Sequence, residues 1–366
     1  MTSADYEKLL VSPDISLLEA VKIMNATSMQ ILLVVDEHHS LLGVITDGDI
    51  RRAILEDVNF SDTIESVITR NPVILTGSPD KKTALALMKK HDIRHIPLVD
   101  SRGKISGLLM WKDFYENGDI AVNKKPNKVV IMAGGKGTRL DLFTKILPKP
   151  LIPVGEKPII GHIMDNFSKY GFSSFLISLN YKAEMIKIYF SDNHHDYHID
   201  YIQEEDYLGT AGALKLAREK LCDTFIVTNC DVIIDTNIER LFNYHKENEN
   251  HATILSTVRN IKIPYGVLMS DKANLQAIIE KPEYNFVINS GIYVLDPEII
   301  NLISEKQPID MPDLLIYAKD KGYKVQIFPM TCSWFDVGEW GEYKRAVEHM
   351  TELGAFNRLE SHGSTR

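Results

Sequence analysis

The stretch Val129-Val-Ile-Met-Ala-Gly-Gly-Lys-Gly-Thr-Arg-Leu140 decides how most of this 366-residue chain folds. An apolar run of strand length leads directly into a glycine-rich loop, which can turn successive backbone N–H groups toward an anion. No Gly-Lys-Ser/Thr closes the loop, so it is not a Walker loop, and Gly135-x-Gly137 lacks the third glycine of a dinucleotide fingerprint. The pattern predicts an anion-binding loop at the end of a strand.

A lysine framed by prolines follows in Leu147-Pro-Lys-Pro-Leu-Ile-Pro-Val154. The prolines restrict the backbone, so Lys149 is presented with little conformational entropy left to lose. A lysine that met only solvent would need no such frame. Lys149 is therefore a second candidate contact for an anion.

The chain beyond residue 128 alternates strand-length apolar runs with helix-length amphipathic segments. The predicted strands are Val129–Met132, Phe175–Leu179, Phe225–Thr228, Ala252–Val258 and Val325–Phe328, and Ile160–Tyr170 and Ala211–Glu219 are predicted helices. This alternation predicts an α/β fold with a Rossmann-like, mostly parallel sheet and helices on both faces.

Gly134-Gly-x-Gly-Thr-Arg139 and Pro148-Lys-Pro150 together resemble the sugar-nucleotide pyrophosphorylase family, over about residues 128–350. The resemblance implies a GT-A-like nucleotidyltransferase domain with a mixed, mostly parallel sheet. It also implies that Arg139 and the loop amides hold the β- and γ-phosphates of an NTP, while Lys149 touches the α-phosphate. The loop residues expected to bind substrate are Ala133, Gly134, Gly135, Gly137 and Thr138.

Further motifs of this family follow in the expected order. Asn229-Cys-Asp231 and Trp334-Phe-Asp-Val-Gly338 resemble its two metal segments, with Asp231 and Asp336 as Mg²⁺ ligands; Cys230 stands where glycine is commoner. Three segments resemble the family's sugar-binding elements, and the residues they imply are Gly266, Glu280, Lys281, Asn289 and Gly291. Taken singly, Asp231 could cap a turn, Asp336 a helix, and Lys281 could be a solvated turn lysine. Five motifs in family order favour the site.

The base should be read near Gln203, Gly209 and Thr210, because Leu208-Gly-Thr-Ala-Gly212 is similar to a segment of GDP-mannose and related guanylyltransferases. That similarity favours GTP, although the motif is shared widely.

The first 122 residues contain an internal repeat. Ser12-Pro-Asp14 recurs as Ser78-Pro-Asp80, Gly43 as Gly107, and the acidic residue that opens the last helix, Asp49, as Asp113. The β-α-β-β-α order resembles a tandem pair of CBS modules. The resemblance implies an adenine nucleotide, or a nucleotide-like pathway product, held by its ribose hydroxyls.

The two copies differ at the expected ribose contacts. Thr46 and Asp49 match the family's ribose pattern, but Met110 replaces the expected hydroxyl residue ahead of Asp113, which predicts at most one competent nucleotide site. Either aspartate could instead be a simple helix cap. CBS pairs commonly associate face to face, which implies a homodimer or tetramer.

This domain combination resembles glucosamine-1-phosphate guanylyltransferases that serve legionaminic acid synthesis. The expected product is an NDP-sugar for surface-glycan or nonulosonic acid synthesis. The choice of glucosamine 1-phosphate rests on domain architecture more than on pocket residues. Mannose 1-phosphate with GTP, or another pairing of NTP and sugar 1-phosphate, is therefore the alternative.

The expected domains are a CBS pair at 1–122, a linker at 123–128, a catalytic domain at 129–352 and a flexible tail at 353–366.

Composition limits the possible partners and location of the protein. A net charge of -9 argues against a nucleic-acid partner. No apolar run approaches the roughly 20 residues of a membrane helix, and three cysteines without a CxxC suit a reducing cytoplasm.

Two other classes of protein compete with the transferase. A catalytically inactive nucleotide-sugar sensor would be expected to lose a key residue, whereas Arg139, Lys149, Asp231 and Asp336 are all present. A CBS-gated Rossmann oxidoreductase is disfavoured by the missing third glycine.

Overall fold

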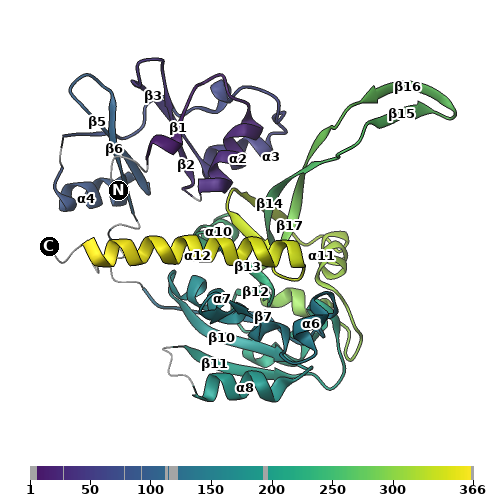
Figure 1. The fold of residues 1–366 in the computed structure, drawn as a ribbon. Helices are drawn as coiled ribbons and strands as arrows, with labels where there is room; N and C mark the ends of the chain where they lie inside the picture. Colours follow the sequence, from purple (N-terminus) through teal and green to yellow (C-terminus); the bar gives the residue numbers. More distant parts are fainter. Residues whose placement is uncertain are drawn as a thin grey trace. The chain divides into compact units, whose positions relative to one another are not determined.

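The computed structural model describes residues 6–363 except 28, 78, 92, 112–113, 115–122 and 193–196. The chain forms two compact units (Figure 1). The first comprises Met1–Ala121, Ser256–Ile288 and Pro329–Cys332, and the second comprises Val122–Leu255, Asn289–Phe328 and Ser333–Arg366. The segment Ser256–Ile288 thus groups with the N-terminal part of the chain, although it was expected to belong to the catalytic domain.

The first unit contains two copies of one β-α-β-β arrangement. Each copy has a three-stranded sheet whose first two strands are parallel and whose last two are antiparallel. The first copy comprises η1 (Glu7–Leu9), β1 (Leu10–Val11), α2 (Leu17–Thr27), β2 (Ile31–Val35), β3 (Leu41–Thr46), α3 (Asp47–Leu55) and η2 (Ile64–Val67). The second comprises β4 (Leu75–Thr76), α4 (Lys81–His91), β5 (His95–Val99) and β6 (Ile105–Met110). The predicted repeat is therefore present in the fold.

Helix α2 covers the first sheet because its apolar residues recur every three or four positions. Leu17, Val21 and Met24 are at most 2% exposed and belong to one cluster with β2, whose five residues are all buried. The second copy has a smaller buried cluster around Met88 and Ile96.

In the described part of the chain, the large sheet has the strand order β11-β10-β7-β12-β17-β14-β18. The strands are β7 (Lys125–Met132), β10 (Phe172–Leu179), β11 (His198–Gln203), β12 (Phe225–Asn229), β14 (Ala252–Lys262), β17 (Glu283–Leu295) and β18 (Val325–Met330). Strands β11, β10, β7 and β12 run parallel, and β17 is antiparallel to β12. The predicted mixed, mostly parallel α/β sheet is confirmed. Strand β7 starts at Lys125, inside the segment expected to be a linker.

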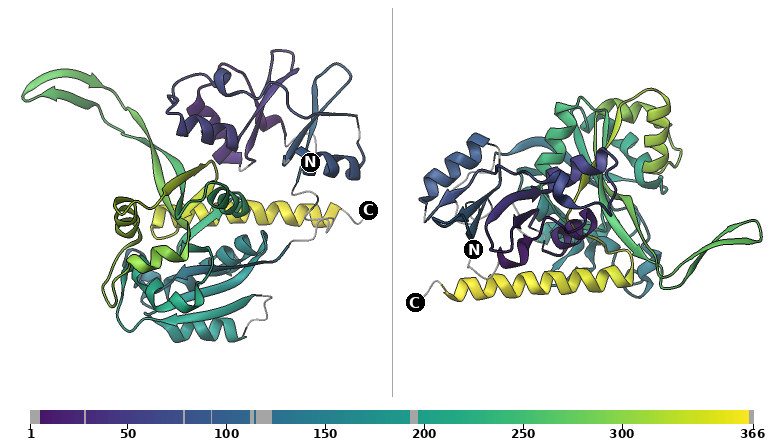
Figure 2. Two further views of the ribbon diagram at one scale, coloured as in Figure 1. Left: turned by 180° about the vertical axis from the view of Figure 1, so that it is seen from behind. Right: turned by 90° about the horizontal axis from the view of Figure 1, so that it is seen from above.

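Strand β7 lies inside the sheet, between β10 and β12. Val129, Val130 and Ile131 are completely buried, as expected for a parallel strand covered on both faces. The longer helices are α7 (Ile159–Ser168), α8 (Ala183–Asp192), α10 (Ile238–Glu247), α11 (Met311–Asp320) and α12 (Trp340–Gly363). Helix α12 continues through most of the expected tail at 353–366 (Figure 2).

Short elements complete the chain. They are η3 (Thr138–Leu140), α6 (Asp141–Thr144), η4 (Lys149–Leu151), β8 (Pro153–Val154), β9 (Lys157–Pro158), α9 (Gly209–Gly212), η5 (Ala213–Lys220), β13 (Val232–Asp235), β15 (Val267–Asp271), β16 (Asn274–Ile279), η6 (Pro297–Leu302) and β19 (Ser333–Asp336). The predicted helix Ala211–Glu219 is divided between α9 and the 3₁₀ segment η5. No helix among the described residues is long and apolar enough to cross a membrane.

Candidate active site

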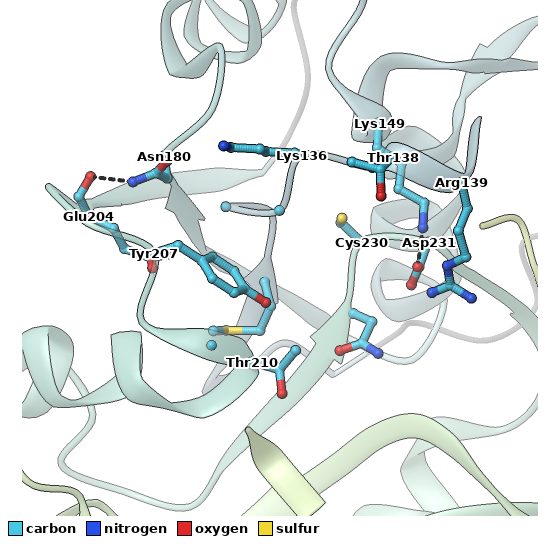
Figure 3. A pocket seen from close by; sticks show the side chains of 16 residues that line it. Lys136, Thr138, Arg139, Lys149, Asn180, Glu204, Tyr207, Thr210, Cys230 and Asp231 are labelled. Carbon is cyan, nitrogen blue, oxygen red and sulfur yellow. Dashed lines mark hydrogen bonds and ion pairs between the residues drawn. The ribbon is translucent and has the colours of Figure 1, made fainter. Parts of the chain in front are cut away.

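A cavity of about 550 Å³ opens in the second unit, beside the residues that follow β7 and β12 (Figure 3). Ligands of open α/β sheets bind outside the carboxyl ends of the strands, so the position fits the fold. The cavity is lined by Met132, Gly134, Gly135, Lys136, Gly137, Thr138, Arg139, Lys149, Asn180, Glu204, Tyr207, Gly209, Thr210, Asn229, Cys230 and Asp231. Nine of the predicted site residues are in this set.

The glycines of the loop after β7 serve two different purposes. Gly137 has a φ of 67°, which glycine adopts without strain, and its carbonyl accepts a hydrogen bond of 3.0 Å from Thr144 Oγ1. Gly134 has no positive φ, but a Cβ there would lie 2.6 Å from Glu204 Oε1. Glycine is therefore needed at Gly137 for its positive φ and at Gly134 for close approach.

The loop presents backbone donors to the cavity. The Ala133 N–H donates to Ser178 O at 3.0 Å, as part of the strand ladder, and Ala133 does not line the cavity. Across the described residues, no partner is found for the N–H groups of residues 134–137. These four N–H groups are available to donate to an anion, whereas the Ala133 N–H already donates to Ser178 O.

Lys149 lies against the first predicted metal ligand. Its side chain is 9% exposed, and its ammonium donates to Asp231 Oδ2. Asp336 is the last residue of β19 and pairs with Val232 of β13, so it adjoins Asp231. The Val337 N–H donates to Asp231 O at 2.9 Å, which fixes the two segments together. The fold therefore brings the lysine and both predicted carboxylates into one cluster.

Burial, followed by the negative charge of Asp231, raises the pKa of Asp336. The Gly338 N–H, Lys149 and Arg139 oppose that rise. Arg139 Nη1 lies 3.9 Å from Asp336 Oδ2 and 3.4 Å from Glu339 Oε1, and its side chain is 61% exposed. The carboxylate pair thus lies next to one buried and one exposed cation.

The two carboxylates fit a magnesium ion. Hard oxygen ligands suit Mg²⁺, which usually takes one or two carboxylates and completes its shell with water and substrate phosphates. Among the described residues no group of three or more His, Cys, Asp or Glu is placed to hold a metal. Asp231 and Asp336 would therefore hold the ion together with a bound polyphosphate.

The wall nearest the predicted base site differs from the expectation. Gln203 does not line the cavity; its amide donates to Leu179 O at 3.4 Å. Asn180, Glu204 and Tyr207 line it instead. Asn180 follows β10, and ligands of open α/β sheets bind outside the carboxyl ends of the strands, so its position after a predicted strand is the signal that could have found it.

Glu204 and Thr210 are fixed by their own contacts. Glu204 is 3% exposed and accepts hydrogen bonds from Ser178 Oγ at 2.6 Å and from the Leu208 N–H at 3.1 Å. The Thr210 N–H donates to Asp310 Oδ1 at 2.9 Å. Gly209 has a φ of 80° and lies against the backbone of Ile309. These contacts hold this wall of the cavity in place.

The residues predicted to hold the sugar fall in both units. Asn289 and Gly291 lie on β17 in the second unit, outside the cavity lining, where a Cβ on Gly291 would be 2.8 Å from Asn229 Nδ2. Gly266, Glu280 and Lys281 belong to the first unit. They flank the β15–β16 ribbon that continues β14 and β17 (Figure 1).

The predicted ribose residues of the first CBS copy form a helix cap. Asp49 is 6% exposed, and its Oδ2 accepts hydrogen bonds of 2.7 Å from both the N–H and the Oγ1 of Thr46. Thr69 Oγ1 and Arg52 donate to its other oxygen. Asp49 is therefore the N3 residue of a capping box whose N-cap is Thr46, rather than the N-cap itself. Asp113 lies outside the described residues.

Comparison with known proteins identifies the family to which the chain belongs. The nucleotidyl transferase family model matches residues 128–352, and the CBS domain model matches residues 5–56 and 64–117. The chain belongs to the nucleotidyl transferase family and carries a CBS pair ahead of that domain, as the predicted resemblance to sugar-nucleotide pyrophosphorylases implied.

Individual relatives are sugar-1-phosphate nucleotidyltransferases. A mannose-1-phosphate guanyltransferase from Yarrowia lipolytica is 36% identical over 230 residues, which span 58% of this chain and 61% of that protein. A UTP–glucose-1-phosphate uridylyltransferase from Synechocystis is 31% identical over 241 residues, 60% of this chain and 62% of that one. The crystal structure of HddC from Yersinia pseudotuberculosis with GMP-PN matches at a TM-score of 0.50 and 27% identity, covering 61% of this chain and 99% of that one.

Proposed function

We propose that the chain transfers a nucleoside monophosphate from an NTP to a sugar 1-phosphate, releasing pyrophosphate and an NDP-sugar. One observation carries the proposal: residues 134–137, whose N–H groups have no partner among the described residues, line one cavity with Lys149 and Asp231, and Asp336 adjoins Asp231. Amide donors and a lysine suit a triphosphate, and paired carboxylates suit the metal that accompanies it.

The reaction needs charge neutralisation more than proton transfer. A phosphate oxygen of the sugar 1-phosphate attacks the α-phosphorus in line, and the bond from that phosphorus to the pyrophosphate oxygen breaks. The nucleophile is already ionised at neutral pH, so no general base is needed. Mg²⁺ held by Asp231 and Asp336 would supply charge neutralisation at the phosphates. Arg139, Lys149 and Lys281 would bind and orient the two anionic substrates.

Cys230 is not a competing nucleophile. Its thiol lines the cavity, but burial, followed by the charge of Asp231, raises its pKa to about 12. The thiol is protonated at neutral pH, and only a thiolate attacks efficiently. Direct transfer between the two substrates is therefore favoured over a covalent enzyme intermediate.

GTP and glucosamine 1-phosphate are the proposed substrates. The relative from Yarrowia is named a guanyltransferase, and HddC was solved with GMP-PN, which supports a guanine nucleotide. The relative from Synechocystis is named a uridylyltransferase, so UTP is the alternative nucleotide. Glucosamine rests on the CBS pair ahead of the transferase, as in enzymes of legionaminic acid synthesis, and mannose 1-phosphate is the second candidate acceptor.

A pyrophosphate-release assay tests the proposal. The full chain is incubated with Mg²⁺, each of the four common NTPs, and glucosamine or mannose 1-phosphate. Release that requires both substrates, fastest with GTP and glucosamine 1-phosphate, is expected. Release with no pair, combined with tight binding of an NDP-sugar in calorimetry, would instead support the inactive nucleotide-sugar sensor.

The CBS pair is proposed to bind an adenine nucleotide or a pathway product through Thr46 and Asp49, in a homodimer or tetramer. The cap at the start of α3 already places the Asp49 carboxylate beside the Thr46 hydroxyl. Calorimetry with AMP, ADP and ATP should give one site per chain, lost in Asp49→Ala. Asp49→Asn is the control for the capping box, because the amide oxygen of asparagine can still accept a hydrogen bond from the Thr46 N–H. Light scattering at micromolar protein measures the assembly.

A further inference from the structure

Three charged groups of the candidate active site surround Gly338. A Cβ placed on that residue would lie 2.7 Å from Lys149 Nζ, 2.7 Å from Asp336 Oδ1 and 3.4 Å from Asp231 Oδ2. The Gly338 N–H donates to Asp336 Oδ1 at 2.9 Å. Glycine at this position thus leaves room for one ammonium and two carboxylates to meet.

Lys149 is the buried cation of this cluster. Its side chain is 9% exposed and that of Asp231 is 16% exposed, whereas Arg139 is 61% exposed and lies 3.9 Å from Asp336 Oδ2 and 3.4 Å from Glu339 Oε1. A buried charge without a partner is strongly destabilising. The Lys149 ammonium and the Asp231 carboxylate therefore depend on each other when no ligand is bound.

We propose that Lys149 occupies the cation position at Asp231 in the nucleotide-free protein, so that a divalent metal ion binds well only together with the NTP. The inference rests on the proposed function of the cavity. The ammonium occupies Asp231 Oδ2, an oxygen that the ion needs, and its positive charge repels the ion.

A bound triphosphate would remove this competition. It offers Lys149 a second anion in the same cavity, which releases Asp231 for the metal. Because coupling between two ligands is reciprocal, the metal in turn strengthens NTP binding. Coupling of this kind typically changes an affinity by about 5- to 150-fold.

The test measures metal binding without any nucleotide or sugar phosphate. Mn²⁺ is titrated into the full chain, and free Mn²⁺ is followed by electron paramagnetic resonance. Lys149→Met is expected to bind Mn²⁺ about 5- to 150-fold more tightly than the wild type. Lys149→Arg keeps the charge and should match the wild type. Lys136→Met, which removes another lysine of the same cavity, should also match it.

A second substitution of Lys149 covers a failure of Lys149→Met to fold. Lys149→Gln keeps a hydrogen-bond donor for Asp231 and should show the same tighter binding. Adding Asp231→Asn to either variant should abolish the gain. Circular dichroism establishes which variants are folded, and Mn²⁺ should raise their unfolding temperature more than that of the wild type.

The inference is overturned if a folded Lys149→Met or Lys149→Gln variant binds Mn²⁺ no more tightly than the wild type, or if Lys136→Met gains as much. An enzyme with no turnover would count against the proposed function alone. The Mn²⁺ affinities report on the lysine and the carboxylates without any reaction.

Discussion

Gly134 and Gly135 are adjacent glycines for which the structure predicts opposite responses to alanine. A Cβ on Gly134 would lie 2.6 Å from Glu204 Oε1, whereas a Cβ on Gly135 would meet nothing within 4 Å. Neither residue has a positive φ. Gly135→Ala is thus the matched control for Gly134→Ala, since both remove glycine freedom from the same loop.

The clash at Gly134 cannot be relieved cheaply. Glu204 is 3% exposed, and its two oxygens are held by Ser178 and Leu208. Overpacking a buried site costs about 1–3 kcal/mol. A domain of 150–250 residues loses about 2–4 °C of unfolding midpoint for each kcal/mol. Gly135→Ala should be neutral or stabilising by about 0.4–1 kcal/mol, because it restricts the unfolded chain.

Scanning calorimetry of the ligand-free variants measures this difference. The reasoning predicts that Gly134→Ala unfolds below the wild type and Gly135→Ala at or above it. In the double variant Gly134→Ala/Glu204→Asp the shorter carboxylate should withdraw, so alanine should cost less there than in the wild type. An unfolding midpoint of Gly134→Ala equal to that of Gly135→Ala would refute the close-approach argument.

Three more predictions concern charged groups. Lys149→Ala and Asp231→Asn should each lower kcat about 10²–10³-fold with an unchanged far-ultraviolet spectrum, because loss of one preorganised contact costs about 2.7–4 kcal/mol; near-normal turnover would contradict the site. Burial and the charge of Asp231 raise the pKa of Asp336, so on acidification kcat/KM should fall at a higher pH than for an ordinary carboxyl, as a pH profile would measure. Burial acts to raise the pKa of Asp296, but hydrogen bonds such as that from His245 lower it overall. The ionised Asp296 carboxylate therefore stabilises the fold at pH values above its unfolded pKa, and this stabilisation is lost as the pH falls through its folded pKa. In denaturant titrations, the free energy of unfolding of Asp296→Asn should accordingly change less with acid pH than that of the wild type.

The parts of the site that sequence could predict are local in the chain. The glycine loop and Lys149 between its prolines are recognisable from a few neighbouring residues, and Asp231 is implied by the resemblance of Asn229-Cys-Asp231 to a metal segment of the family. All three line the cavity. The repeat that predicted the CBS pair is also a pattern within one segment, and its first copy folds as expected.

The parts that sequence could not predict depend on which strands become neighbours. Asn180 and Glu204 reach the cavity because β10 lies beside β7 and β11 lies beside β10, an order that no local pattern specifies. The pairing of Lys149 with Asp231 joins residues 82 positions apart. Gln203 was chosen for the base from its place in a motif, yet the neighbouring Glu204 faces the cavity, because successive side chains at a strand end point to opposite sides.

Cys230 connects the resemblance to the electrostatics of the site. The thiol is 8% exposed and stays neutral, so it adds an apolar wall next to Asp231, at a position where the family more commonly has glycine. An apolar wall excludes water and makes an unpaired carboxylate more costly. Asp231 and Asp336 therefore depend on a nearby cation at every stage. Without a ligand, the buried cation next to Asp231 is the Lys149 ammonium. During turnover, by our proposal, a metal ion shares that role, and the lysine becomes available to the phosphates.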